Sequence, residues 1–267
     1  MSIRNIIVPS IKRVPGAQTL YKLIDRHLLQ PSKGYGIGTN NFANREKWIR
    51  EQLQALPSGY KLLDAGAGEQ QYKKFCSHLK YVAQDFGEYN PETLPVGDQM
   101  PTWSYGKLDI VSDITQIPVP DGSFDAVLCA EVLEHVPDPI AALKEFSRIL
   151  RPGGTLLVST PFCSMTHFAP YHFCTGFNKY FFGHHLPRLG FTIKSLTPSG
   201  NYYEYVAQEM YRLRYTSKQY SGFWGGILTR LAWHQIIQQL HYLSTKDTNS
   251  NELVNYQYFV KATKNSS

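Results

Sequence analysis

The stretch Lys61–Tyr72, KLLDAGAGEQQY, carries an apolar run into an acid, two glycines and a set of polar residues. This order is typical of a strand that ends in a glycine turn and passes into a helix. It predicts a strand over residues 60–66 and a short helix over residues 71–79. Glycine in such a turn lets the backbone approach a ligand closely, so the turn is a candidate binding site.

The chain on either side of this stretch alternates between strand-like and helix-like segments. Apolar runs predict further strands over residues 80–86, 108–114, 124–136, 154–161, 191–198 and 255–263. A helix is predicted over residues 138–150, with Asp138 as its N-cap and Pro139 in its first turn; residues 177–187 are predicted to be partly helical. Strands that alternate with helices favour a mostly parallel sheet with helices on both faces.

Four of the predicted strands end on or near an acid: Asp64, Asp85, Asp113 and Glu131. In open parallel sheets a ligand binds beyond the carboxyl ends of the strands. Asp85 follows the first turn glycine, Gly66, by 85 − 66 = 19 residues. This is close to the spacing of about 20 residues at which an acid hydrogen-bonds the ribose hydroxyls of a nucleotide. The pattern therefore predicts a nucleoside site.

The residues of the turn argue against a dinucleotide and against a triphosphate. A dinucleotide turn needs a glycine at the sixth position counted from Gly66, where this chain has Gln71, and no Lys-Ser or Lys-Thr pair follows. The carboxylate of Asp64 would repel phosphates but suits a cation. Adenosine joined to a positively charged, ammonium-bearing tail fits these residues, which indicates S-adenosylmethionine (SAM).

Four segments in order resemble the class I SAM-dependent methyltransferases, in particular the type 11 group. They read LLDAGAG, then QD, then SDITQIPVPDGSFDAVLCAEVLEHVPDP, then LRPGGTLLVSTP. The resemblance covers about residues 58–200 and extends to the last strand. It implies a Rossmann-like α/β fold with a mostly parallel seven-stranded sheet and helices on both faces.

The resemblance also implies roles for the residues that match its pattern. Asp64, Gly66 and Gly68 would lie under the methionine part of SAM, and Asp85 would bind the ribose. Asp113 would bind the adenine amino group, Ile114 would add a backbone contact, and Ala130 and Glu131 would flank the donor. The family often has a third glycine where this chain has Gln70, so the contact at the head of the first helix departs from the pattern.

Three histidines follow the fourth and fifth predicted strands and are candidates for the acceptor side. His135 is the candidate base or acceptor-orienting group, and His167 and His172 are candidate substrate-binding residues. No metal site is expected, because His167 and His172 stand five residues apart in a loop with Pro170 and no further Cys/His pair completes a set. Cys163 could act as a nucleophile on a cytosine carbon, but the fourth strand lacks the Pro-Cys turn of such enzymes.

The two ends of the chain differ from this core pattern. Residues 1–57 are predicted to be an N-terminal arm and cap, with a short helix near Leu20–Leu29 and an amphipathic helix over residues 44–56. Residues 58–267 form the predicted methyltransferase domain, with a helical insert over residues 200–250. In that insert an apolar stripe recurs at helical spacing and would be buried within the chain or in a homodimer: Ile227, Leu231, His234, Ile237 and Leu240.

Composition favours a globular cytoplasmic enzyme. The four cysteines form no CxxC pair, no signal peptide precedes the domain, and the apolar region GFWGGILTRLAWHQII contains Arg230 and His234, which argues against a membrane span. The predicted function is methyl transfer from SAM to a small organic acceptor, at oxygen. Two alternatives stay open: an RNA or protein methyltransferase, because the net charge is +6 although no clear nucleic-acid motif is present, and a SAM-fold interaction module without catalysis.

Overall fold

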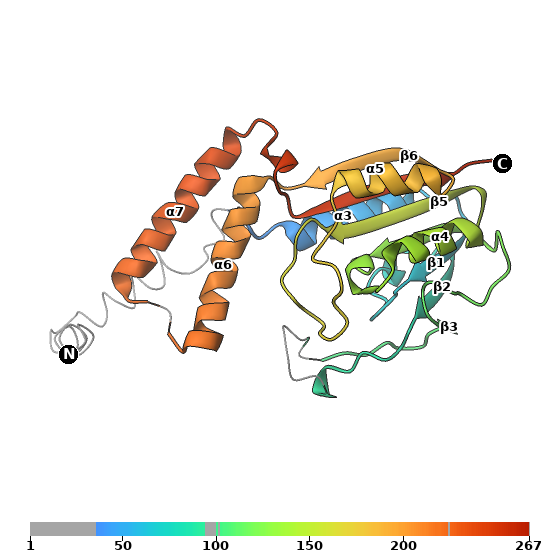
Figure 1. The fold of residues 1–267 in the computed structure, drawn as a ribbon, viewed down its shortest axis with the longest axis horizontal. Helices are drawn as coiled ribbons and strands as arrows, with labels where there is room; N and C mark the ends of the chain where they lie inside the picture. Colours follow the sequence, from blue (N-terminus) through green and yellow to red (C-terminus); the bar gives the residue numbers. More distant parts are fainter. Residues whose placement is uncertain (1–35, 94–99, 101, 224, 267) are drawn as a thin grey trace. The chain divides into compact units, whose positions relative to one another are not determined.

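A computed structural model describes residues 36–93, 100, 102–223 and 225–266 of the chain (Figure 1). Its central feature is a seven-stranded sheet in the order β3-β2-β1-β4-β5-β7-β6. The strands are β1 (Lys61–Ala65), β2 (Lys80–Asp85), β3 (Ile110–Val111), β4 (Phe124–Ala130), β5 (Leu150–Pro161), β6 (Phe191–Ser199) and β7 (Gln257–Lys264). The helix predicted near Leu20–Leu29 lies outside the described residues.

The directions of the strands confirm the predicted fold class. The pairs β1–β2, β1–β4, β2–β3 and β4–β5 are parallel, whereas β7 runs antiparallel to both β5 and β6. Five strand ends therefore meet at one edge of the sheet, where the sequence places its acids. Two strands are shorter than predicted: β3 has two residues, and β4 ends at Ala130, before a one-turn helix, η3 (Leu133–His135).

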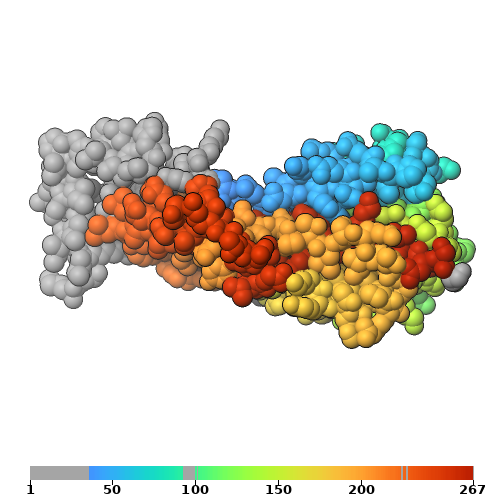
Figure 2. All heavy atoms as spheres, turned by 90° about the horizontal axis from the view of Figure 1, so that it is seen from above, coloured from blue at the N-terminus to red at the C-terminus, as the bar shows by residue number. Residues whose placement is uncertain are grey.

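Helices cover both faces of the sheet, because neighbouring residues of its central strands point to opposite sides. Leu63 packs on the face covered by α4 (Pro139–Ile149) and α5 (Lys179–Arg188). Leu62 packs on the other face, against Ile49 and Leu53 of α3 (Asn41–Gln54). Seen from above, the blue atoms that include α3 and the golden-yellow atoms that include α5 lie on opposite sides of this part of the chain (Figure 2).

The chain after the glycine turn is the main departure from the predicted elements. The helix predicted over residues 71–79 is wrong: only the single turn η1 (Lys73–Phe75) forms there. Gln70 adopts a left-handed backbone conformation, with φ of +58°. An α-helix cannot pass through a residue in that conformation, so the turn is not followed by an α-helix. The helix predicted over residues 138–150 is confirmed as α4, and Asp138 caps it by accepting from Ile140 N and Ala141 N.

A second compact unit comprises residues 36–40 and Tyr202–Thr248, separate from residues 41–201 and 249–266. It contains two long helices, α6 (Tyr202–Ser221) and α7 (Ile227–Thr245), which confirms that the region is helical. The face of α7 that packs against α6 is centred on Trp233 and Ile237, and Leu231 of the predicted stripe is 38% exposed. None of the helices in the described ranges combines the length and apolar character needed to cross a membrane.

Short 3-10 turns complete the described chain: η2 (Pro91–Thr93) lies after β2 and η4 (Ser250–Glu252) precedes β7.

The helix predicted over residues 44–56 is confirmed as α3, whose Trp48 stacks on Phe259 of β7 with ring centroids 4.9 Å apart. By Cα packing α3 groups with the sheet rather than with the residues before it. The capping roles of residues 1–57 and 200–250 stay predictions.

Candidate active site

The glycine turn after β1 needs glycine for two reasons. Gly66 has φ of +73°, a conformation that side chains disfavour. A Cβ atom at Gly66 would also lie 2.5 Å from Cγ2 of Val132. The amide of Gly66 donates to the carbonyl of Gln84 at the end of β2, over 2.9 Å. The turn is therefore held against β2 and the segment after β4 with no room for a side chain.

Asp85 lies beside this turn, as the spacing from Gly66 predicts. Its Oδ2 accepts from Gly68 N over 2.9 Å and its Oδ1 accepts from Gly87 N over 3.1 Å. Burial raises the pKa of Asp85, and the backbone donors at Gly68 and Gly87 partly counter that effect. The carboxylate thus joins the turn after β1 to the loop after β2 in one cradle.

Asp64 is a buried acid, only 2% exposed, and no basic side chain contacts it in the described residues. Its Oδ2 accepts from the hydroxyl of Tyr81 over 2.6 Å. Burial raises the pKa of Asp64 to about 6, which the hydrogen bond from Tyr81 partly offsets. An acid in this state gains from a cation beside it, so Asp64 fits the ammonium-bearing tail that the sequence indicates.

Asp113 and Ile114 lie in the loop after β3. Asp113 is exposed, and its Oδ1 accepts from both the amide and the hydroxyl of Thr115, each over 2.7 Å. The Ile114 side chain is buried in the core on the α4 face. Their contacts with adenine stay predictions.

Glu131 follows Ala130, the last residue of β4, and adopts a left-handed conformation with φ of +56°. Strained conformations of this kind gather at functional sites. Its Oε2 lies 2.6 Å from Nη1 of Arg45 and its Oε1 accepts from Ser159 Oγ over 3.0 Å. Burial lowers the pKa of Arg45, but Glu131, Tyr72 and Glu134 together outweigh it, so the pKa is raised. Sequence reasoning missed Arg45, because it comes from α3, far from the segments of the family pattern.

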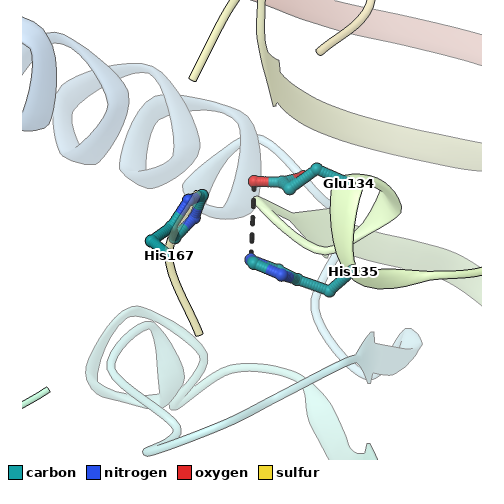
Figure 3. A group of neighbouring side chains, drawn as sticks. All are labelled: Glu134, His135 and His167. Carbon is teal, nitrogen blue, oxygen red and sulfur yellow. Dashed lines mark ion pairs between the residues drawn. The ribbon is translucent and has the colours of Figure 1, made fainter. Parts of the chain in front are cut away.

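The three histidines predicted for the acceptor side form one cluster with Glu134, which we call the histidine cluster: Glu134, His135, His167 and His172. The rings of His135 and His167 have centroids 4.7 Å apart, and those of His167 and His172 are 5.0 Å apart. Figure 3 shows Glu134 and His135, both from η3, converging with His167 from the loop after β5. The predicted grouping of the three histidines therefore exists in the fold, and Glu134 is a member that the sequence analysis missed.

Backbone contacts hold the loop after β5 against η3. His135 Nδ1 contacts the carbonyl of Tyr171 over 2.5 Å. The amides of Phe173 and Cys174 donate to the carbonyl of Glu134 over 2.9 Å and 3.1 Å. These contacts fix the cluster to rigid elements at the carboxyl end of the sheet.

The histidine cluster contains a carboxylate without a partner. Glu134 is 1% exposed and neither of its carboxylate oxygens has a hydrogen-bond partner. Burial, and then the charge of Glu131, raise the pKa of Glu134 well above its ordinary value. Burial, followed by repulsion from His167, lowers the pKa of His135 to about 4, so its ring is neutral near pH 7.

Aromatic side chains lie over the turn and beside the histidine cluster. Phe168 contacts Tyr89, Trp103 and His135, with ring centroids 4.5 to 5.3 Å apart. A Cβ atom at Gly68 would lie 3.0 Å from the ring of Trp103, so this aromatic group packs directly on the turn. The sequence analysis did not single out these residues, since isolated aromatics in loops follow no spacing rule.

The family comparison agrees with this geometry. Residues 63–158 match a family model described as "Methyltransferase domain". Over these residues the chain is similar to the methyltransferase family. The matched range runs from β1 to β5 and so includes the turn, Asp85 and the β4–η3 segment.

Curated relatives of this methyltransferase domain match over part of their length. A "Ubiquinone biosynthesis O-methyltransferase" of Xanthomonas axonopodis pv. citri is 35% identical over 120 residues, which are 43% of this chain and 48% of the relative. A "Probable S-adenosylmethionine-dependent methyltransferase" of Mycolicibacterium smegmatis is 29% identical over 130 residues, 47% of this chain and 48% of the relative. The chain thus spans about half the length, or less, of the curated relatives it matches.

Solved structures support the fold of the methyltransferase domain. A SAM-dependent methyltransferase from Archaeoglobus fulgidus has a TM-score of 0.51 at 14% identity and covers 91% of this chain and 99% of that chain. The [4+2]-cyclase SpnF has a TM-score of 0.52 at 15% identity and covers 93% and 95%. At these identities the likeness extends to the fold alone, and a fold by itself does not determine the reaction.

Proposed function

We propose that this chain transfers a methyl group from SAM to an oxygen atom of a small organic acceptor. The observation that carries the proposal is the cradle in which Asp85 accepts from the amide of Gly68 while Asp64 is buried beneath the same turn. It offers a carboxylate for ribose, glycines for close approach and an acid for the donor's ammonium group. The match of residues 63–158 to a methyltransferase model supports the same donor.

The reaction is an in-line displacement on the donor's methyl carbon. The acceptor's oxygen forms a bond to that carbon, the carbon–sulfur bond breaks with its electron pair staying on sulfur, and S-adenosylhomocysteine leaves. The acceptor's hydroxyl proton must pass to a base or to solvent. Because the donor is already activated, the protein acts chiefly by holding oxygen, methyl carbon and sulfur in line.

The histidine cluster is the proposed acceptor side. The His135 ring is neutral at pH 7, and its Nδ1 faces the carbonyl of Tyr171, so Nε2 can accept a hydrogen bond from an acceptor hydroxyl. A pKa of about 4 makes this ring a weak base, so we assign His135 to orienting the acceptor rather than to removing its proton. His167 and His172 are proposed to line the same side.

Oxygen as the accepting atom has support from the relatives. The Xanthomonas proteins carry the name O-methyltransferase, and one of them is 35% identical over 43% of this chain. An aromatic and histidine-rich loop after β5 suits an organic ring or chain better than a polyanion. All four cysteines are free, consistent with the proposed cytoplasmic location.

The test is calorimetric titration of the purified chain with S-adenosylhomocysteine, with NAD and ATP as matched ligands. Micromolar binding of the first ligand alone is expected, and turnover of SAM would then be measured with phenols and other hydroxyl compounds. Binding of NAD or ATP in its place would contradict the proposal. Donor binding without turnover on any acceptor class would favour the interaction module, and affinity for RNA that falls with salt would favour an RNA methyltransferase.

A further inference from the structure

Glu134, His135 and His167 bring three potential metal ligands together from two parts of the chain. One ligand atom from each residue lies within 4.8 Å of the other two, and Oε1 of Glu134 is 3.8 Å from Nε2 of His135. The sequence spacing hides this set, since only the fold places the loop after β5 beside η3. The two rings and the carboxylate converge on one space (Figure 3).

The hydrogen bonds of the two rings determine which nitrogen is free. Nδ1 of His135 contacts the carbonyl of Tyr171, and Nδ1 of His167 contacts the carbonyl of Met165 over 2.9 Å. A carbonyl only accepts, so each Nδ1 carries the proton, and a neutral ring then keeps its lone pair on Nε2. An imidazole that donates from one nitrogen to a backbone carbonyl while the other is free is the arrangement found for metal-ligating histidines.

One carboxyl group in this region lacks a hydrogen-bond partner among the described residues. Arg45 pairs with Glu131 at 2.6 Å, whereas Glu134 is buried without a hydrogen-bond partner. Nε2 of His135 lies 3.8 Å from Oε1 of Glu134. In the neutral ring this nitrogen carries a lone pair and no proton, so it cannot donate a hydrogen bond to a Glu134 carboxylate. A buried carboxyl group without a hydrogen-bond partner is costly, and a bound cation would satisfy it.

We propose that Glu134, His135 and His167 bind one divalent metal ion of the zinc class. Two imidazole nitrogens and one carboxylate oxygen suit borderline ions such as Zn²⁺ or Co²⁺ rather than Mg²⁺ or Ca²⁺, which prefer all-oxygen sites. Ligands of one tetrahedral zinc ion lie roughly 3.4 Å apart, as bonds of about 2.0–2.1 Å dictate. The most distant pair of ligand atoms, up to 4.8 Å apart, therefore needs to approach by about 1.4 Å.

Three protein ligands leave a coordination position open, as in metal sites that bind a reacting group. Metal binding itself goes beyond the proposed function and does not depend on it. Where the proposed function also holds, the open position takes the acceptor's oxygen, and the metal replaces the contact assigned above to His135 Nε2. A bound cation lowers the pKa of a hydroxyl, so it would supply the activation that a weakly basic His135 lacks.

The experiment is metal titration of the full chain after treatment with a chelator. Zn²⁺ affinity is measured by competition with a chromophoric chelator, and Co²⁺ binding by its visible absorption, which intensifies when four or five ligands replace water. The variants are Glu134→Gln, which keeps the side-chain shape, and His167→Asn. His184→Asn, on the exposed surface of α5, is the matched control.

The wild-type chain should bind one equivalent of Zn²⁺ and show an intense Co²⁺ spectrum. Each cluster variant should weaken binding at least about 10-fold, since even loss of an outer-shell partner costs that much, while His184→Asn stays within about 2-fold of wild type. Absence of stoichiometric binding, or binding that the cluster variants leave unchanged, would overturn the proposal. Unfolding temperatures and S-adenosylhomocysteine titrations of the same samples report folding and the donor site separately, so failure of the metal site is distinct from failure of the proposed function.

Discussion

The turn that we propose holds the donor (the donor turn, Asp64 to Gly68 with Asp85) and the histidine cluster lie at the same sheet edge but differ in how their polar groups are hydrogen-bonded. In the donor turn both carboxylates have hydrogen-bond donors, namely Tyr81 for Asp64 and two backbone amides for Asp85. In the histidine cluster Glu134 has none. The difference indicates that the turn is preorganised by the protein itself, whereas the cluster requires something further to complete it.

The two regions also differ in how far apart in sequence their parts lie. The donor turn is assembled from β1 and β2, which are parallel neighbours. The cluster region draws on η3, on the loop after β5 and, through Arg45 and Glu131, on α3. The two regions nevertheless touch, because a Cβ atom at Gly66 would meet Val132 directly before η3.

Gly66→Ala should have the largest effect. The substitution forces a side chain into a left-handed conformation, at a cost of about 1–3 kcal/mol, and places Cβ 2.5 Å from Val132. We expect S-adenosylhomocysteine binding to be undetectable by calorimetry and the unfolding temperature to fall by several degrees. Gly183→Ala in α5 is the matched control and should bind as wild type. A Cβ atom added there would meet no atom of another element within 4 Å, and φ is not positive. Equal donor affinity in both variants would remove the argument for close backbone approach.

Asp64→Asn should weaken donor binding about 10- to 100-fold, the range expected for a hydrogen bond to a charged group. It should also change the pH dependence. The pKa of Asp64 is raised to about 6, so below that pH a cationic donor must displace a proton, and wild-type affinity should fall about tenfold per pH unit.

The asparagine variant should lack this dependence between pH 4.5 and 7, about the interval below and around the raised pKa. Affinity is measured by calorimetry at each pH, with the fluorescence unfolding curve as a check on folding. A wild-type affinity that is flat over the same interval would show that Asp64 does not face the ammonium group.

Arg45→Met should lower the free energy of unfolding by about 1–3 kcal/mol, because it leaves Glu131 without its cation. This loss of stability is smaller than for a fully buried ion pair, since the side chains of Arg45 and Glu131 are 16% and 23% exposed. Lys74→Met, which breaks the exposed Lys74–Glu46 pair, is the control and should not change stability measurably. Urea unfolding of both variants makes the comparison, and equal effects would mean that the Arg45 pair is only a surface contact.

Gln70→Gly should have the smallest effect. Glycine relieves the left-handed conformation of residue 70 but removes the hydrogen bonds from Gln70 Nε2 to the carbonyls of Tyr105 and Lys107. These terms oppose each other, so stability should stay within about 1 kcal/mol of wild type. Urea unfolding measures the change in the free energy of unfolding, with Gln71→Gly as the control. A loss above about 2 kcal/mol would assign Gln70 a larger part in holding the loop over the donor turn.

The sequence by itself predicted the Rossmann-like fold and the glycine turn that we propose as the donor site. Alternation of apolar segments predicted the sheet, because buried parallel strands read as continuous apolar runs. Gly66, Gly68 and Asp85 could be placed together from spacing alone, since one strand–turn–strand unit brings them to one edge. The sequence analysis was wrong about the helix after the turn, because the left-handed conformation of Gln70 has no signature in composition or periodicity.

Only the tertiary structure decided the surroundings of Glu134. Its neighbours come from η3 and from the loop after β5, and the Arg45 that neutralises the adjacent Glu131 comes from α3. Local sequence encodes the direction of a strand and the space in a turn. It does not encode which distant side chains share one buried volume, because that depends on how the loops close over the sheet. The balance of charge around Glu134 is therefore decided by the tertiary structure.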